Sequence, residues 1–182
     1  MTRGQTPCHV SASERTNMNI ILTGMPASGK STVGVILAKV LGYGFVDTDL
    51  LIQRSATARL EEIIAERGVE AFLDLESSVC RSLSAENTVI ATGGSVVYRE
   101  ASMLHFKELG TIVYLKVGMD ALKARLFDMK ERGVALKEGQ SLEDLFLERT
   151  CLYERYADLT VDESSLGLED TVKLVRDGLQ KI

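Results

Sequence analysis

The sequence lacks the features that mark membrane-spanning and secreted proteins. No apolar run among the 182 residues approaches the ~18 residues that a membrane span requires. Residues 1–17 contain no apolar core of a secretory signal. The three cysteines, Cys8, Cys80 and Cys151, are scattered and show no metal-ligand spacing, as is typical of free thiols in a reducing compartment. We therefore expect a cytoplasmic protein that does not contact a membrane.

Proline and excess positive charge are also scarce. Only two prolines, Pro7 and Pro26, are present, so few positions break a helix or a strand. The net charge of −5 speaks against a broad nucleic-acid-binding face. Residues 1–17 are polar and without periodicity, and we expect a disordered N-terminal extension there. A hydrophobic content of 45% then predicts one globular domain over residues 18–182.

Short apolar segments alternate with amphipathic segments along this domain. The predicted strands are residues 19–23, 44–48, 88–92, 111–117 and 159–162. The predicted helices are residues 30–41, 49–54, 59–67, 69–85, 99–109, 119–131, 141–157 and 168–180. Such alternation is typical of an α/β fold with three layers, in which helices cover both faces of a five-stranded parallel sheet. Ligands of such folds bind beyond the carboxyl ends of the strands.

One motif names a ligand chemistry. Residues 24–31 read GMPASGKS and match the phosphate-binding loop G-x-x-x-x-G-K-[ST] between a predicted strand and a predicted helix. Glycines let backbone N–H groups turn toward an anion, and the N-terminus of the following helix adds positive potential. Lys30 is expected to reach the β- and γ-phosphates, and the Ser31 hydroxyl to bind Mg²⁺. The expected nucleotide contacts are Gly24, Met25, Pro26, Ala27, Ser28, Gly29, Lys30, Ser31 and Thr32.

Two carboxylates follow the second predicted strand. Asp47 and Asp49 are two residues apart, so at the end of a strand they point to the same side. One of them can hold the Mg²⁺ shell near Ser31, and the other can orient a substrate hydroxyl or accept its proton. The alternative is that Asp49 caps the helix that follows. The phosphate-binding loop in the same sheet favours the functional interpretation.

A double glycine follows the third predicted strand, in residues 92–95 (TGGS). Gly93 and Gly94 permit close approach to the backbone and leave N–H groups free for an anion or a hydroxyl. A tight strand-to-helix turn has the same sequence, so the residues leave both interpretations open.

Arginines occur near two further helices. Arg125 and Arg132 are seven residues apart, and the aperiodic stretch that follows predicts a mobile lid over about residues 132–141. An ordinary loop after a solvated helix end is the alternative. On the helix predicted at 141–157, Arg149 and Arg155 can each bind a carboxylate or lie on a solvated face, and their spacing does not choose between them.

Five motifs occur in a set order from Met18 to Ile182. They are residues 24–32 (GMPASGKST), 45–49 (FVDTD), 91–94 (ATGG), 148–153 (ERTCLY) and 161–162 (VD). No single motif is specific, but their order and spacing resemble the shikimate kinase family. The resemblance implies an ATP- and Mg²⁺-dependent enzyme with strand order 2-3-1-4-5 in the nucleoside monophosphate kinase type of fold. We expect a monomer whose partners are ATP and a small hydroxylated acid.

The resemblance also implies roles for individual residues. It assigns Asp47 to the Mg²⁺ shell with Ser31, and Asp49 to the acceptor hydroxyls. The arginine near the adenine corresponds to Arg125 and the lid arginine to Arg132. The implied catalytic residues are Lys30, Asp49 and Arg132, and the implied acceptor-binding residues are Asp49, Gly93, Gly94 and Arg149, within or near a helical segment at about 49–87. The resemblance thereby selects Arg149 over Arg155.

The chain departs from the family at the acceptor side. In residues 68–76 (GVEAFLDLE), Leu73 occupies the position of an arginine that grips the substrate carboxylate in the family. Loss of such a charge-assisted contact would weaken binding roughly ten- to a hundredfold. Asp74 beside it adds charge of the wrong sign for an acid. Ser95 replaces a third glycine, and Gly133 replaces a proline of the lid.

Three hypotheses follow. Phosphorylation of shikimate is the leading one. A kinase for another acceptor, such as a sugar acid or a hydroxy amino acid, is the alternative that Leu73 and Ser95 motivate. A nucleotide-binding protein without turnover is the third, and the presence of Lys30, Asp49 and Arg132 together argues against it.

Overall fold

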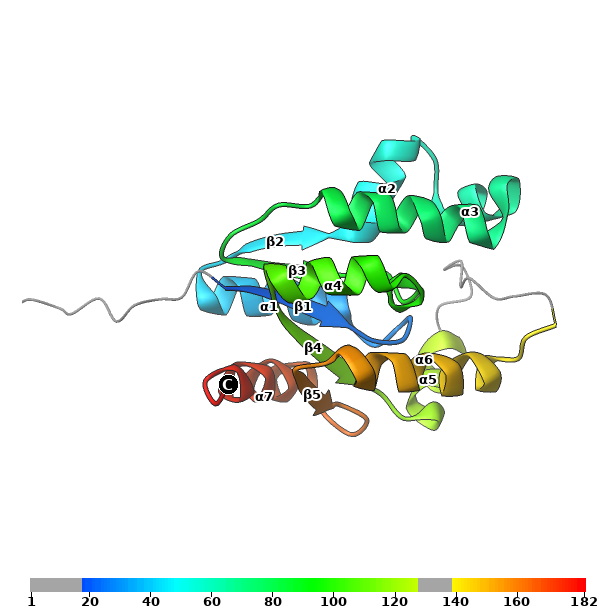
Figure 1. Ribbon diagram of the computed structural model, residues 1–182. Coiled ribbons are helices and arrows are strands. Elements are labelled where there is room, and N and C mark those ends of the chain that lie inside the picture. The colour runs from blue at the N-terminus through cyan, green and yellow to red at the C-terminus, as the bar shows by residue number, and fades with distance from the viewer. Residues whose placement is uncertain (1–17, 128–138) are drawn as a thin grey trace, which may run out of the picture.

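Five parallel strands form one sheet in the computed structural model, which describes residues 18–127 and 139–182 (Figure 1). The strands are β1 Asn19–Thr23, β2 Gly44–Asp47, β3 Thr88–Ala91, β4 Gly110–Lys116 and β5 Leu159–Asp162. Their order is β2-β3-β1-β4-β5, and each neighbouring pair is parallel. The predicted α/β class and the strand order 2-3-1-4-5 are therefore confirmed.

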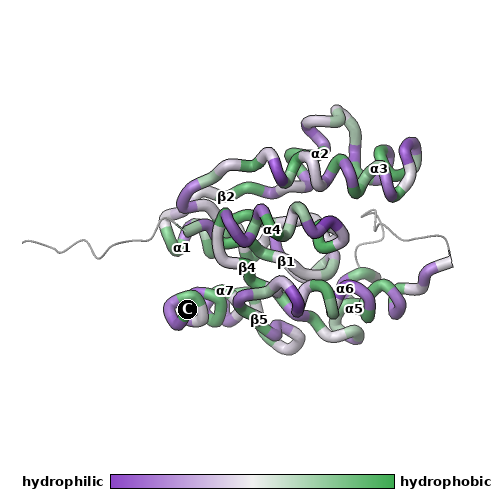
Figure 2. The backbone as a smooth tube through the Cα atoms, viewed as in Figure 1, coloured by the Kyte–Doolittle hydropathy of each residue, from purple (hydrophilic) through white to green (hydrophobic). Residues whose placement is uncertain are grey.

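Helices connect the strands. Those of the described residues are α1 Lys30–Leu41, α2 Thr48–Ala56, α3 Leu60–Ser82, the short 3₁₀ helix η1 Val96–Tyr98, α4 Glu100–Leu109, α5 Met119–Phe127, α6 Leu142–Tyr156 and α7 Leu168–Leu179. Within this part of the chain, no helix has the length and apolar character needed to cross a membrane. The helices alternate hydrophobic and hydrophilic residues along their length, as amphipathic surface helices do (Figure 2).

Alternate strand residues face two different hydrophobic layers. Ile20, Leu22, Val89 and Val113 pack with side chains of α1 and α7 on one face of the sheet. Ile21, Ile90, Ile112 and Tyr114 pack with side chains of α3, α4, α5 and α6 on the other. Because successive strand residues point to opposite faces, the continuous apolar strands supply both layers. The expected three-layer arrangement is confirmed.

The boundaries differ from the predicted ones at several places. Strand β2 ends at Asp47 because that side chain caps α2 and accepts a hydrogen bond from the Asp49 backbone N–H at 3.0 Å. Element α3 is interrupted at Gly68, where φ is 78° and ψ is 167°, so the predicted division into two helices at this residue is confirmed, although the second part ends at Ser82 and not at residue 85. Helix α5 is described to Phe127, so the rest of the predicted helix 119–131 lies outside the described residues, as does the expected extension at 1–17.

Helices α2 and α3 build a small core of their own. Ile52, Ile63, Phe72 and Leu73 are buried against one another there. This pair of helices lies to one side of the carboxyl ends of the strands, and α5 and α6 lie to the other side (Figure 1). Functional side chains at this edge of the sheet therefore come from both groups of helices.

Candidate active site

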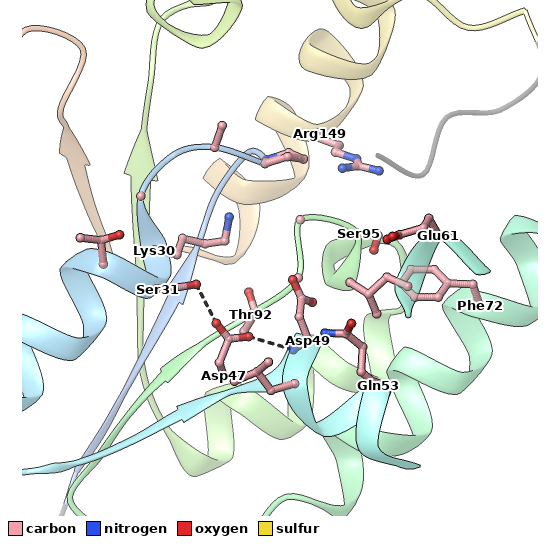
Figure 3. A pocket seen from close by; sticks show the side chains of 18 residues that line it. Lys30, Ser31, Asp47, Asp49, Gln53, Glu61, Phe72, Thr92, Ser95 and Arg149 are labelled. Atoms are coloured by element: carbon pink, nitrogen blue, oxygen red, sulfur yellow. Dashed lines mark hydrogen bonds between the residues drawn. The ribbon is translucent and has the colours of Figure 1, made fainter. Parts of the chain in front are cut away.

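One pocket opens at the carboxyl edge of the sheet and has a volume of about 410 Å³ (Figure 3). The predicted site residues among those that line it are Pro26, Ala27, Gly29, Lys30, Ser31, Thr32, Asp47, Asp49, Gly93, Gly94 and Arg149. Sequence reasoning missed Leu50, Gln53, Leu60, Glu61 and Phe72, which come from α2 and α3 and also line it. The pocket therefore joins the phosphate-binding loop to the α2–α3 pair.

The loop between β1 and α1 has the backbone shape that its glycines permit. Gly24 and Gly29 have φ values of 147° and 80°, a region that residues with a Cβ rarely adopt. A Cβ on Gly24 would also lie 2.6 Å from the Leu115 carbonyl oxygen. Gly24 lies behind the pocket lining, whereas Gly29 lines the pocket and immediately precedes α1. The N-terminus of α1 therefore points at the space where an anion would bind.

Lys30 lies at the centre of the loop. Its Nζ donates hydrogen bonds to the carbonyl oxygens of Gly24 at 2.9 Å and Met25 at 2.8 Å. Burial lowers the pKa of Lys30 to about 8, and the Asp49 carboxylate is the strongest influence that opposes this. A phosphate beside the ammonium would stabilise its charged form. The side chains of Met25 and Ser28, two of the predicted nucleotide contacts, are buried. These residues can therefore offer backbone groups, and not side chains, to a ligand.

Ser31 and Asp47 are in contact with each other in the pocket lining. The Ser31 Oγ donates a hydrogen bond to Asp47 Oδ2 at 2.7 Å, while Asp47 Oδ1 caps α2 (Figure 3). The suggestion that Asp49 acts as the helix cap is therefore wrong, because Asp47 fills that position. Asp49 instead lies one residue into the helix and lines the pocket. A hydroxyl and a carboxylate oxygen together are donors of the type that Mg²⁺ prefers.

The Gly93–Gly94 turn is packed between several side chains. The Gly93 N–H donates to the buried Thr48 Oγ1 at 3.1 Å, which ties the turn to the start of α2. A Cβ on Gly93 would overlap Glu76 Oε1 and lie 2.8 Å from Asp49 Oδ1. A Cβ on Gly94 would lie 2.9 Å from Pro26 Cδ and 3.2 Å from Arg149 Nη1. The two glycines are thus required by close packing, and the turn also lines the pocket.

Arg149 and Arg155 occupy different surroundings on α6. Arg149 is 1% exposed, donates from Nε to Tyr98 Oη at 3.3 Å, and lines the pocket opposite the α2–α3 pair (Figure 3). Arg155 is exposed and lies 3.8 Å from Glu100. The structure therefore brings Arg149, and not Arg155, to the pocket, a distinction that spacing along the helix could not make.

Arg125 lies at the edge of the loop, outside the residues that line the pocket. Its Nη1 forms an ion pair with Glu163 Oε1 at 2.5 Å and donates to the Ala27 carbonyl at 3.5 Å. Burial raises the pKa of Glu163, and Arg125 opposes that rise. Glu163 escaped sequence reasoning, although it directly follows β5, at the edge where ligands bind in such folds. Arg132 and most of the expected lid at 132–141 lie outside the described residues.

Leu73 and Asp74 lie away from the pocket. Leu73 is buried in the small core of α2 and α3. Asp74 points to the surface and accepts from Arg99 Nε at 2.9 Å. The expectation that Asp74 places the wrong charge in the acceptor site is therefore wrong, because consecutive helical residues face different directions.

A parallel sheet with this loop, an adjacent carboxylate pair and a buried pocket arginine defines a small P-loop kinase. The thymidylate kinase of Candida albicans shares the fold, with a TM-score of 0.60 at 13% identity over 91% of this chain and 92% of that chain. The nucleoside monophosphate kinase type of fold is thus confirmed.

Closer similarities identify the family. A family model described as shikimate kinase matches residues 26–178. The shikimate kinase of Caldanaerobacter subterraneus subsp. tengcongensis is 34% identical over 160 residues, which cover 86% of this chain and 93% of the relative. The shikimate kinase of Acinetobacter baumannii, solved in complex with shikimate, superposes with a TM-score of 0.84 at 30% identity over 91% of this chain and 94% of that chain. The chain belongs to the shikimate kinase family.

Proposed function

We propose that this protein transfers the γ-phosphoryl group of ATP to a hydroxyl group of shikimate. Family membership and the likeness to a kinase solved with shikimate support this acceptor over a sugar acid or a hydroxy amino acid. The observation that carries the proposal is the single pocket that contains the phosphate-binding loop, Asp49 and the buried Arg149. It offers a donor site, a proton acceptor and a carboxylate-binding cation within one chain, so we infer that a monomer suffices.

Each half of the pocket has a role in the transfer. The loop N–H groups and Lys30 bind the phosphates and stabilise the charge that develops on the leaving ADP oxygen. Arg149 binds the acceptor carboxylate and orients the acceptor. Asp49 accepts the proton of the attacking hydroxyl as the new O–P bond forms and the bond between the β-bridging oxygen and the γ-phosphorus breaks. The products are ADP and the phosphate ester.

The residues present also fit Mg²⁺. The Ser31 hydroxyl and the Asp47 carboxylate are adjacent oxygen donors next to the loop, and we propose that they hold the ion, directly or through water. A bound Mg²⁺ would neutralise charge on the phosphate oxygens. Because ATP is supplied in the cytoplasm, we place the reaction there.

The decisive test is ADP release measured with a coupled assay over a panel of acceptors. The panel contains shikimate, a sugar acid and a hydroxy amino acid, each with saturating ATP and Mg²⁺. We expect shikimate to have the highest kcat/KM. A higher kcat/KM for another acceptor would overturn the proposal, and ATP binding without turnover on any acceptor would favour the non-catalytic alternative.

A further inference from the structure

Glu76 is a buried acid that the mechanism above leaves without a role. It lies on α3 and is 1% exposed. Neither of its carboxylate oxygens has a hydrogen-bond partner at good geometry among the described residues, and the Ser95 hydroxyl interacts with the carboxyl only as a weak donor. A charged carboxylate without hydrogen bonds is strongly disfavoured in a protein interior. A buried group in this state calls for a functional explanation when it borders a binding pocket.

Glu76 borders the acceptor pocket through a single glycine. Glu76 Oε1 and Asp49 Oδ1 both lie close to the point where a Cβ of Gly93 would project, the latter at 2.8 Å. Gly93 and Asp49 line the pocket, whereas Glu76 lies directly behind the turn. Two carboxyl groups from different helices therefore share one side of the Gly93 backbone.

Charged groups from several elements face Glu76. Burial raises the pKa of Glu76 to about 8, and the Asp49 carboxylate on α2 adds to the rise. The Ser95 hydroxyl, Arg149 on α6 and Lys30 on α1 oppose it. On its own helix, the thiol of Cys80 faces Glu76 and has its pKa raised by burial and by that carboxyl. These influences together leave Glu76 uncharged near neutral pH.

Helix α3 supplies no cation at the nearest helical position. Leu73 lies three residues before Glu76, the spacing at which helical side chains are neighbours. Leu73 is 2% exposed and packs with Ile52, Ile63 and Phe72. An apolar neighbour cannot compensate a negative charge on Glu76, whereas a cation there would.

We propose that Glu76 is a positioning residue that works as an uncharged carboxyl, and that its ionisation weakens acceptor phosphorylation. The inference rests on the proposed function. Ionised Glu76 places a second negative charge beside Asp49 and behind the Gly93–Gly94 turn. It repels the Asp49 carboxylate and competes for Arg149 and Lys30, the cations that serve the anionic substrates. Acceptor binding and transfer therefore decline when Glu76 loses its proton.

The first test replaces Glu76 by an uncharged isostere, Glu76→Gln. We measure kcat/KM for shikimate at saturating ATP and Mg²⁺ from about pH 6.5 to about pH 9.5. In the unmodified protein, kcat/KM is expected to fall several-fold as the pH rises through about 8. The Gln variant should keep its neutral-pH activity and lose this decline, because the phosphates of saturating ATP keep Lys30 charged over the same range. A Gln variant with the same alkaline decline, or a folded Gln variant without activity at any pH, would overturn the proposal.

A second variant compensates the negative charge of ionised Glu76 with a nearby cation. Leu73→Arg places a guanidinium one helical turn from Glu76, and the ion pair should also remove the alkaline decline. Leu73→Met is the matched control, because it keeps an apolar side chain of similar volume and should retain the decline. Equal alkaline declines in the folded Arg and Met variants would contradict the proposal.

A third measurement does not depend on the acceptor. A folded-state pKa above the unfolded value of Glu gives stability that is complete below about pH 4.5 and is lost as the pH rises toward about 8. Urea unfolding without substrates should show this loss in the unmodified protein and less of it in Glu76→Gln. Identical pH slopes would overturn the inference about Glu76. If shikimate is not phosphorylated at any pH but the slopes differ, the proposed function fails while the uncharged state of Glu76 stands.

Discussion

The two halves of the pocket are built in different ways. The donor half comes from one continuous stretch, residues 24–32, and offers mainly backbone N–H groups and Lys30 to a ligand. The acceptor half combines side chains from α2, α3, the turn after β3 and α6, which are far apart in the sequence. A local, backbone-built site tolerates little change, because its geometry depends on glycines and one lysine. A site assembled from distant side chains can lose one contact at a time, and the resemblance places such a loss at Leu73, which is buried in the α2–α3 core outside the pocket.

Removal of Lys30 should have the largest effect and tests the donor half. Lys30→Ala is expected to lower kcat at least about a hundredfold with every acceptor, since a preorganised charge beside the phosphates is lost. Lys39→Ala, at an exposed position of the same helix, is the control and should leave kcat unchanged. The measurement is steady-state kcat of both variants, with circular dichroism as a check that each is folded. Retained activity in Lys30→Ala would mean that the loop does not serve the transfer.

Removal of Arg149 should affect the acceptor half alone. Arg149→Ala is expected to raise the KM for shikimate roughly ten- to a hundredfold, because a charge-assisted contact to the carboxylate is lost. The KM for ATP should change little. Arg155→Ala on the same helix is the matched control, since that arginine is exposed and pairs only loosely with Glu100. A similar shikimate KM in both variants would show that Arg149 does not bind the carboxylate.

The contrast between the halves also explains what the sequence could predict. The three layers follow from local periodicity and the donor loop from one contiguous motif, whereas the strand order follows from the resemblance to the family, and the structure agrees with all three. The surroundings of individual side chains could not be predicted from these local patterns. Leu73 and Asp74 are adjacent, yet one enters a small core and the other pairs with Arg99 at the surface. Which face of α3 meets the pocket depends on packing against α2, which no short motif encodes.

Glu76 and Glu163 illustrate the same limit. In the sequence, Glu76 ends the segment 68–76 that resembles the family, but only the approach of α3 to Gly93 shows that its carboxyl lies beside the pocket. Glu163 is placed at the loop by its ion pair with Arg125, which is 38 positions earlier in the chain. Both are non-local contacts, so they become visible only when the fold brings the segments together.

An added methyl group at Gly93 sharpens the comparison within the acceptor half. Gly93→Ala forces a Cβ against Glu76 and Asp49, and overpacking of this kind costs about 1–3 kcal/mol of stability. The KM for shikimate should rise as the turn shifts, with little change in the KM for ATP. Gly167→Ala is the control, because nothing lies within 4 Å of its Cβ position, and it should cost less than about 1 kcal/mol. Urea unfolding and kinetics on both variants test the difference.

The smallest effect is expected at Asp74, beside the residue that departs from the family. Asp74→Asn removes the negative charge of an ion pair with Arg99. The Asp74 side chain is 73% exposed. Such surface pairs contribute at most about 1 kcal/mol, so the free energy of unfolding should change little. The KM for shikimate should stay the same, because the side chain faces away from the pocket. A several-fold lower KM would mean that the charge of Asp74 reaches the acceptor, and that the two faces of α3 are less separate than its packing indicates.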